Sequence, residues 1–404
     1  MRRLFDGRSK LEFPPPWWKV KRELLRVGLQ MDDFILQLTG ISAIQVYSKF
    51  IIDPRVTLKT GALPLGSRMA LYVIFPSQGL QRSHSIALDY ILECGYVPIV
   101  VSNKPLDPSA QATILARSAC LIVRPNFGYD FAAYREGVRY LTPHIADLEY
   151  LALFNDSSWF PAIPDRNWLK EAEGLDRDYV GSVFHNAVDP TVNWDFRVDP
   201  YRPDSSRHNF HYGSYSLLVR RNVLNSPDFD RFWQSYRATN DKIRTVLRGK
   251  IGLTRMVVDA GFSHAATLDT NQLDRILRDL PDQDLREVAA NILVPMHPAL
   301  NTQRLDSLSS DPIDRPALIN FILSAVVKEG PSYALADFDL TRRTGIFIKK
   351  SPLTQDRTSS QQTLNILGKL SSPQARVFHE EADLAHRRKF GAITPASISR
   401  SPRH

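Results

Sequence analysis

Residues 68–102 read RMALYVIFPSQGLQRSHSIALDYILECGYVPIVVS, and this stretch decides the fold. An apolar run at 69–75 precedes a segment at 83–95 whose apolar residues recur at helical spacing, and a second apolar run occupies 97–102. Gly95 suits the end of that helix, because glycine readily adopts the left-handed conformation that closes a last turn. The order strand, helix, strand predicts a βαβ unit with two parallel strands.

The alternation continues toward the carboxyl terminus, with helices expected at 110–117 and 131–141 and strands at 120–124 and 150–154. Four such strands predict an α/β fold with a mostly parallel sheet, whose ligand site lies beyond the carboxyl ends of the strands. Farther along we expect strands at 179–184, 215–220 and 346–349, a long polar loop at 185–213, helices at 229–236 and 253–260, and a mainly helical stretch at 271–350.

Length and composition bound the domain organisation. The chain has 404 residues, of which 43% are hydrophobic and 23% charged, as in ordinary globular proteins. Single cores stop growing near about 250–300 residues, so appendages to one large domain are expected. The predicted parts are a basic, aromatic segment with an amphipathic helix (1–66), the α/β domain (67–270), a helical extension (271–350) and a polar tail (351–404), disordered from about residue 371.

The charge distribution restricts the classes of partner. The formal charge of +8 lies in residues 1–30 and 371–404, and the body between them is neutral. A nucleic-acid groove would carry its basic excess within the folded domain, so nucleic-acid binding is not expected. Basic ends fit an anionic membrane surface better. Two cysteines without metal-ligand spacing predict neither a disulfide nor a cysteine-metal site.

The amino-terminal segment predicts where the protein resides. No run approaches the roughly 20 apolar residues of a membrane-spanning helix, and no secretory signal pattern is present. Apolar residues recur at steps of three and four behind Trp17 and Trp18, which predicts an amphipathic helix on a membrane surface: Val20, Leu24, Val27, Met31, Phe34 and Leu38. We therefore expect a cytoplasmic protein attached peripherally to the inner face of the plasma membrane. Docking of this helix on the main domain or on a second subunit is the alternative.

The densest polar cluster is the strand-to-helix turn RPNFGYDF at 124–131. It combines Arg124, Asn126, Gly128 and Asp130 at a position where polar side chains and free backbone N–H groups can hold a nucleotide. The alternative is an ordinary helix start with Asp130 as its N-cap.

A second polar turn, Asn155-Asp156-Ser157, follows the strand expected at 150–154. The Asp156 carboxylate is placed to ligate a divalent cation, Mg²⁺ or Mn²⁺, or to accept hydrogen bonds from sugar hydroxyls. An Asx turn leaving the strand is the alternative, and one carboxylate is few for a metal site. His208 and His211 lack an acidic partner at metal-ligand spacing, so zinc is not expected.

These residues and two later segments resemble, in order and content, the rhamnan synthesis F family of polysaccharide glycosyltransferases. The family phrases NEGYDF…EG, NDS…GP, SY…R and GL…L…G are matched at 126–137, 155–161, 214–220 and 252–261. The likeness covers about residues 68–267, and residues 347–350 are similar to a late PFIKRELL phrase.

The resemblance implies a GT-A-like fold that transfers an activated sugar such as dTDP-L-rhamnose to a lipid-linked glycan at the cytosolic membrane face. It implies that Asp156 faces the diphosphate or its metal, and that Asn126 and Asp130 lie near the nucleoside and sugar. Arg124, Gly128, Asn155 and Ser157 complete the expected donor site.

The chain departs from the family pattern at Lys250, where a YEIGL phrase has an acid. Inverting transfer needs a carboxylate to take the acceptor's proton, which lysine at its normal pKa cannot do. Asp189, Asp195 or Asp199 in the long loop would supply the base, or the protein transfers a different sugar or has lost activity. Lys250 would then neutralise the leaving diphosphate.

The sequence leaves two further functions open. One is a non-catalytic member of a polysaccharide assembly complex that binds a glycan or nucleotide, which the lysine at position 250 favours. The other is a peripheral membrane scaffold that recruits partners through its helix and basic tail.

Overall fold

The computed structural model describes residues 46–186, 204–295, 297–310 and 312–391, and the single residues 27 and 31. The amphipathic helix predicted over residues 20–38 and most of the long loop, including Asp189, Asp195 and Asp199, lie outside these ranges. The predictions for the membrane-surface helix and for those three candidate bases therefore stay predictions.

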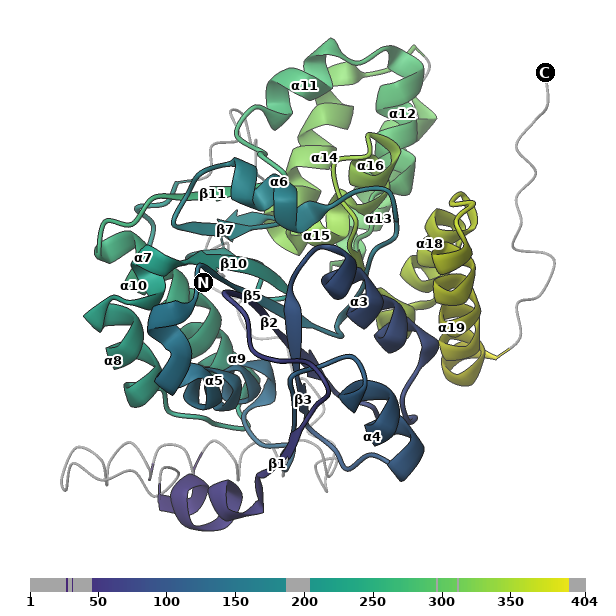
Figure 1. The fold of residues 1–404 in the computed structure, drawn as a ribbon. Helices are drawn as coiled ribbons and strands as arrows, with labels where there is room; N and C mark the ends of the chain where they lie inside the picture. Colours follow the sequence, from purple (N-terminus) through teal and green to yellow (C-terminus); the bar gives the residue numbers. More distant parts are fainter. Residues whose placement is uncertain are drawn as a thin grey trace, which may run out of the picture.

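An eight-stranded mixed sheet forms the centre of the molecule (Figure 1). Its order is β1 (Thr57–Thr60), β4 (Cys120–Val123), β3 (Val97–Ser102), β2 (Arg68–Ile74), β5 (Tyr150–Asn155), β10 (Ser216–Arg220), β7 (Tyr179–Gly181) and β11 (His264–Ala266). The ladders between β4, β3, β2 and β5 and between β7 and β11 are parallel, whereas β1 and β10 run antiparallel to their neighbours. The predicted α/β class with a mostly parallel sheet is confirmed.

Both faces of the sheet are covered, which explains the continuous apolar strands. In β2, Tyr72 packs into the core on the side of α3 (Arg82–Glu93), and Leu71 packs into the core on the side of α5 (Tyr129–Leu141). Successive side chains of a strand point to opposite faces, so a strand buried on both faces needs apolar residues throughout. The helix α4 (Pro108–Leu115) completes the predicted alternation.

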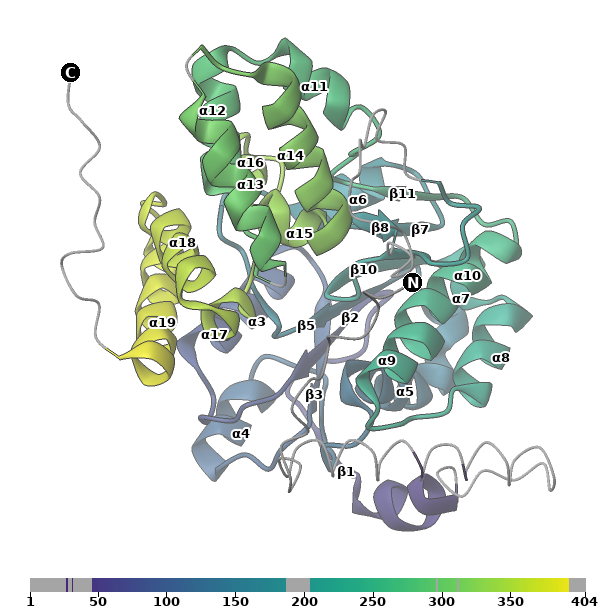
Figure 2. The same ribbon diagram turned by 180° about the vertical axis from the view of Figure 1, so that it is seen from behind.

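The chain beyond β5 adds two short sheets and a group of helices. The elements are β6 (Ser158–Trp159), α6 (Trp168–Gly174), β8 (Phe184–Asn186), β9 (Phe210–Tyr212), α7 (Arg221–Leu224), α8 (Pro227–Ser235), α9 (Lys242–Thr245), the π-helix η4 (Val246–Ile251) and α10 (Gly252–Asp259). Helices α8, α9 and α10 lie beside α5 on one face of the sheet (Figures 1 and 2). The amino-terminal described part contains η1 (Ser48–Ile52) and η2 (Asp53–Arg55), and η3 (Thr142–Asp147) follows α5.

A helical extension stands at the β11 end of the sheet (Figure 1). It contains α11 (Leu273–Asp279), α12 (Asp282–Asn291), α13 (Pro298–Ser309), α14 (Arg315–Glu329), α15 (Pro331–Ala334) and α16 (Ala336–Thr341), as the sequence predicted. The chain then returns to the sheet as β12 (Ile348–Lys349), which pairs with β6. Within the described ranges, every helix is too short or too polar to cross a bilayer.

The disorder predicted from about residue 371 is wrong for residues 373–390, which form α19 (Pro373–Phe390). Together with α17 (Pro352–Gln355) and α18 (Arg357–Gly368) it packs beside α3 (Figure 2). Phe378 is fully buried, and its ring stacks on Trp159 at 6.1 Å between centroids. The polar composition misled the prediction, because a helix docked by one narrow apolar face keeps a polar majority.

Candidate active site

The buried side chain of Arg124 stabilises the turn after β4. Its side chain is 2% exposed and donates to the Asn103 side-chain oxygen at 2.6 Å and to the Phe127 carbonyl at 2.7 Å. The guanidinium is therefore committed to holding the turn, and the predicted contact of Arg124 with a ligand is not supported by its geometry. Asn126 is exposed at the tip of the same turn.

Gly128 starts helix α5 and sets the position of Asp130. Its φ of +80° is left-handed, and an added Cβ would lie 2.6 Å from the Ala132 Cβ, so glycine is required there. Gly128 is the N-cap residue, and the alternative that Asp130 caps the helix is wrong. Asp130 instead lies in the first turn, partly buried.

A hydrogen-bonded cluster surrounds the Asp130 carboxylate at the carboxyl end of β5. Its Oδ2 accepts from the Asn155 amide and from the Ser214 hydroxyl, both at 3.2 Å. The Asn155 amide also lies 3.2 Å from the Tyr134 hydroxyl, which donates to the Ser214 carbonyl at 2.8 Å. The Ser157 hydroxyl donates to the Asn155 side-chain oxygen at 2.5 Å. The two predicted polar turns thus meet in one site.

The charge of Lys250, on the π-helix η4, acts on this cluster. Gly249 makes the approach possible, because a Cβ at that position would lie 2.4 Å from the Phe131 ring. Single turns of π-helix are frequent at functional sites, where they shift a side chain relative to a regular helix. The Lys250 charge acts on Asp130 and on the His185 and His211 imidazoles.

Lys349 is the residue of the site that sequence reasoning missed. The β12–β6 pairing brings it opposite Ser158, and its Nζ donates to the Ser157 hydroxyl at 3.0 Å. The ammonium also lies 3.5 Å from the centroid of the Tyr215 ring, a cation–π distance. The signal in the sequence was the phrase at 347–350, which by itself gives no spatial position.

The electrostatics of the cluster follow from burial and from its two ammonium groups. Burial raises the pKa of Asp130, although the Ser214 hydroxyl and the Lys250 charge oppose the shift. Burial and the neighbouring Lys250 hold the pKa of Lys349 well below its usual range. Burial also lowers the pKa of Lys250. A carboxylate with a raised pKa in a polar cluster at this edge of the sheet is a candidate proton acceptor.

Asp156 points to the opposite face of the sheet from Asp130. Its Oδ2 accepts from the Phe75 backbone N–H at 2.7 Å and lies 3.4 Å from the His84 Nε2. The Gln81 backbone N–H donates to His84 Nδ1, which places the imidazole proton on Nε2, facing Asp156. Burial acts to raise the pKa of Asp156, but the His84 hydrogen bond and the Lys350 charge hold it below its usual value.

The residues present do not fit the divalent cation predicted at Asp156. One oxygen of this carboxylate is already occupied by two N–H groups, and the Lys350 charge lies nearby. Mg²⁺ and Mn²⁺ need several oxygen ligands, and an adjacent ammonium repels them. Among the described residues no three His, Cys, Asp or Glu side chains gather as a cation site.

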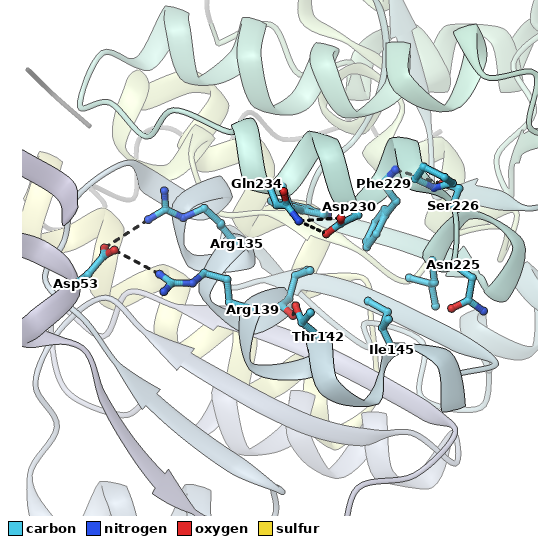
Figure 3. A pocket seen from close by; sticks show the side chains of 14 residues that line it. Asp53, Arg135, Arg139, Thr142, Ile145, Asn225, Ser226, Phe229, Asp230 and Gln234 are labelled. Carbon is cyan, nitrogen blue, oxygen red and sulfur yellow. Dashed lines mark hydrogen bonds and ion pairs between the residues drawn. The ribbon is translucent and has the colours of Figure 1, made fainter. Parts of the chain in front are cut away.

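A surface hollow lies away from this cluster (Figure 3). Its volume is about 770 Å³, and residues of the carboxyl-terminal half of α5 and of α7 and α8 line it. Arg135 and Arg139 on one side both pair with Asp53, at 3.6 and 3.4 Å. These charges are satisfied within the protein, so we place the candidate active site at the carboxyl ends of the strands.

Comparisons with known proteins identify a related sequence, several solved structures and a matching family model. Uncharacterized protein y4gN of Sinorhizobium fredii (strain NBRC 101917 / NGR234) is 24% identical over 274 residues, 67% of this chain. The match spans 66% of that relative's own length.

Solved structures with a similar course of the chain are more remote. Residues 1–349 of S. aureus TarS are 9% identical with a TM-score of 0.26, over 80% of this chain and 89% of that one. The mannosyltransferase Ktr4p from S. cerevisiae is 10% identical with a TM-score of 0.22, over 53% and 69% of the two chains.

A family model describes the centre of the chain. The model of rhamnan synthesis protein F matches residues 98–324, more than half of the chain. This range includes the turn that carries Asp130, the polar turn after β5 and Lys250. The chain therefore belongs to the rhamnan synthesis protein F family.

Proposed function

We propose that this chain is a glycosyltransferase that moves a sugar, rhamnose or a similar deoxyhexose, from a nucleoside-diphosphate donor to a growing cell-surface polysaccharide. The observation that carries the proposal is the hydrogen-bonded cluster of Asp130, Asn155, Ser157 and Lys349 at the carboxyl end of β5, on which the Lys250 charge acts. In α/β sheets of this kind, ligands bind at that edge.

The cluster supplies the charges that sugar transfer needs. A nucleoside diphosphate leaves as an anion, and ammonium groups that contact it stabilise the developing negative charge. The Asn155 amide and the Ser157 and Ser214 hydroxyls offer the short polar groups that hold sugar hydroxyls. A GT-A-like arrangement of donor and acceptor fits this edge of the sheet.

Sugar transfer breaks one bond at the sugar C1 and forms another. The bond between the sugar C1 and the β-phosphate oxygen breaks, and its electron pair stays on the diphosphate. The acceptor hydroxyl oxygen forms the new bond to C1, and its proton passes to a carboxylate. Among the described residues we assign Asp130 as the base, since burial raises its pKa and makes it a better proton acceptor than an ordinary carboxylate. Asp189 and Asp195 remain the alternative bases within the long loop.

The finer assignments follow from family membership and from the sequence. The family's description, rhamnan synthesis, supports rhamnose as the sugar, and we propose a dTDP-L-rhamnose-like donor and a lipid-linked glycan acceptor from family membership. Peripheral attachment to the cytosolic membrane face is proposed from the basic ends of the chain.

Ligand binding and turnover test the proposal. Full-length protein is screened by thermal shift against dTDP, UDP and GDP and their sugars, since a ligand that binds the folded state raises the melting temperature. We expect one nucleoside diphosphate and its sugar to stabilise the protein and the sugar to be transferred to a polysaccharide acceptor. Binding without turnover would favour the non-catalytic binding function, and no binding of any member would refute the proposal.

A further inference from the structure

We propose that sugar transfer by this chain needs no divalent cation, because the ammonium groups of Lys250 and Lys349 neutralise the donor diphosphate directly. The inference rests on the proposed function and concerns its chemistry. The bonds broken and formed are those given above. The electron pair released from C1 goes to a phosphate oxygen that these two lysines contact.

Lys349 is held at the cluster by three independent contacts. The backbone of β12 pairs with β6, the Nζ donates to Ser157 at 3.0 Å, and the same Nζ lies over the Tyr215 ring at 3.5 Å. The Ser157 hydroxyl in turn donates to Asn155, whose amide donates to Asp130. Lys349 is thus linked to the carboxylate through a continuous chain of hydrogen bonds.

Lys250 approaches the same carboxylate from another element. The close contact of Gly249 with the Phe131 ring fixes η4 against α5, and Asp130 lies in the first turn of α5. Two lysines from separate elements therefore lie within electrostatic reach of the Asp130 carboxylate. A second anion, such as a diphosphate, would complete the charge balance.

A divalent cation fits this arrangement poorly. The Asp130 Oδ2 already accepts two hydrogen bonds, and the neighbouring ammonium groups repel a dication. Asp156, the other carboxylate of the two polar turns, faces His84 on the opposite side of the sheet. The site is therefore built to attract phosphate oxygens rather than a metal ion.

Proton uptake on diphosphate binding can be measured without turnover, and it tests whether Lys349 contacts the diphosphate. The groups that act on Lys349 are Lys250 on η4 and Asp130 on α5, with Ser157 and Tyr215 in direct contact. His185 and His211 lie near Lys250, and both imidazole pKa values are lowered by burial and by its charge. Burial and Lys250 lower the Lys349 pKa, whereas a bound diphosphate raises it again. Binding above the free-state pKa of Lys349 must then take up protons.

The experiment is isothermal titration of the full chain with dTDP, UDP and GDP, in EDTA and in Mn²⁺ or Mg²⁺. We expect the affinity of the accepted diphosphate in EDTA to lie within about threefold of its value with metal. Titration in buffers of different ionisation enthalpy should show proton uptake at alkaline pH. Lys250→Met and Lys349→Met should each weaken binding by about 10- to 100-fold, as expected for loss of a charge-assisted hydrogen bond.

Lys350→Met is the matched control, because this lysine directly after β12 lies over the Trp159 ring, at 5.2 Å, and its charge acts on Asp156. It should change the affinity by less than about threefold, consistent with a lysine that does not face the ligand. Thermal unfolding of each variant shows whether it is folded.

Two results overturn the inference alone, and a third overturns the proposed function on which it rests. Binding that disappears in EDTA and returns with Mn²⁺ would show a metal-dependent site and leave the proposed glycosyltransferase function standing. Absence of binding with and without metal would overturn the proposed function itself. Unchanged affinity in both folded lysine variants would show that the two ammonium groups do not contact the diphosphate.

Discussion

Replacing Asp156 with alanine tests whether this carboxylate is structural or contacts the donor. The change removes the acceptor of the Phe75 N–H, at 2.7 Å, and the carboxylate that lies 3.4 Å from the His84 Nε2. A hydrogen bond to a charged group contributes about 1.5–3 kcal/mol, so a loss of about 1.5–3 kcal/mol of unfolding free energy is expected. With an unfolding entropy of about 2.1 cal/mol/K per residue, this corresponds to a fall in melting temperature of about 2–4 °C.

The assay is thermal unfolding of wild type and Asp156→Ala at pH 7, alongside binding of the accepted nucleoside diphosphate. The pKa of Asp156 is lowered in the folded protein, so its stabilisation is present above the unfolded value and is lost as the pH falls through the folded value. The control is Asp165→Ala, which removes an exposed surface pair with Arg343 and should change stability by less than about 1 kcal/mol. A melting temperature within 1 °C of wild type, together with lost binding, would refute the structural interpretation of Asp156.

Three further predictions concern other groups. Asp130→Asn should abolish transfer while nucleotide binding persists. Because burial raises the pKa of Asp130, the wild-type transfer rate should begin to fall on the acidic side at a pH above the ordinary carboxyl pKa. Wild-type turnover in the variant would contradict this role of Asp130. Glu381→Ala should lower the unfolding free energy by about 2–4 kcal/mol, because Glu381 accepts from the Trp159 indole and a backbone N–H, both at 2.9 Å. Denaturant unfolding measures the change, and an unchanged free energy would show that these two hydrogen bonds do not stabilise the docked α19. Burial raises the pKa of Asp339 to about 6, so ionisation of this group should lower the unfolding free energy by up to about 3 kcal/mol as the pH rises from 4 to 7. Asp339→Asn should remove that pH dependence. Identical pH profiles of stability in wild type and variant would contradict the prediction.

The strand and helix alternation of residues 68–155 was predictable from the sequence. Local periodicity specifies β2 by an apolar run and α3 by helical spacing, whereas the helix expected from residue 131 starts at Tyr129 with Gly128 as its N-cap. Such patterns depend on neighbouring residues alone, and apolar strands covered on both faces keep them. Asp130 and Asn155 lie at the same edge of the sheet, because the turn after β4 leads to Asp130 and Asn155 ends β5.

The tertiary structure alone decided which charged groups share the site. Asp156 and Asn155 are adjacent in sequence, but successive residues after a strand face opposite sides, and the structure places Asp156 against His84. Lys349 joins Ser157 across 192 positions through the β12–β6 pairing, a separation at which local pattern carries no signal. The sequence by itself determined the α/β sheet and its polar edge, because those depend on local periodicity. The tertiary structure determined the positions of the two lysines, because a contact between distant segments depends on the packing of the whole chain.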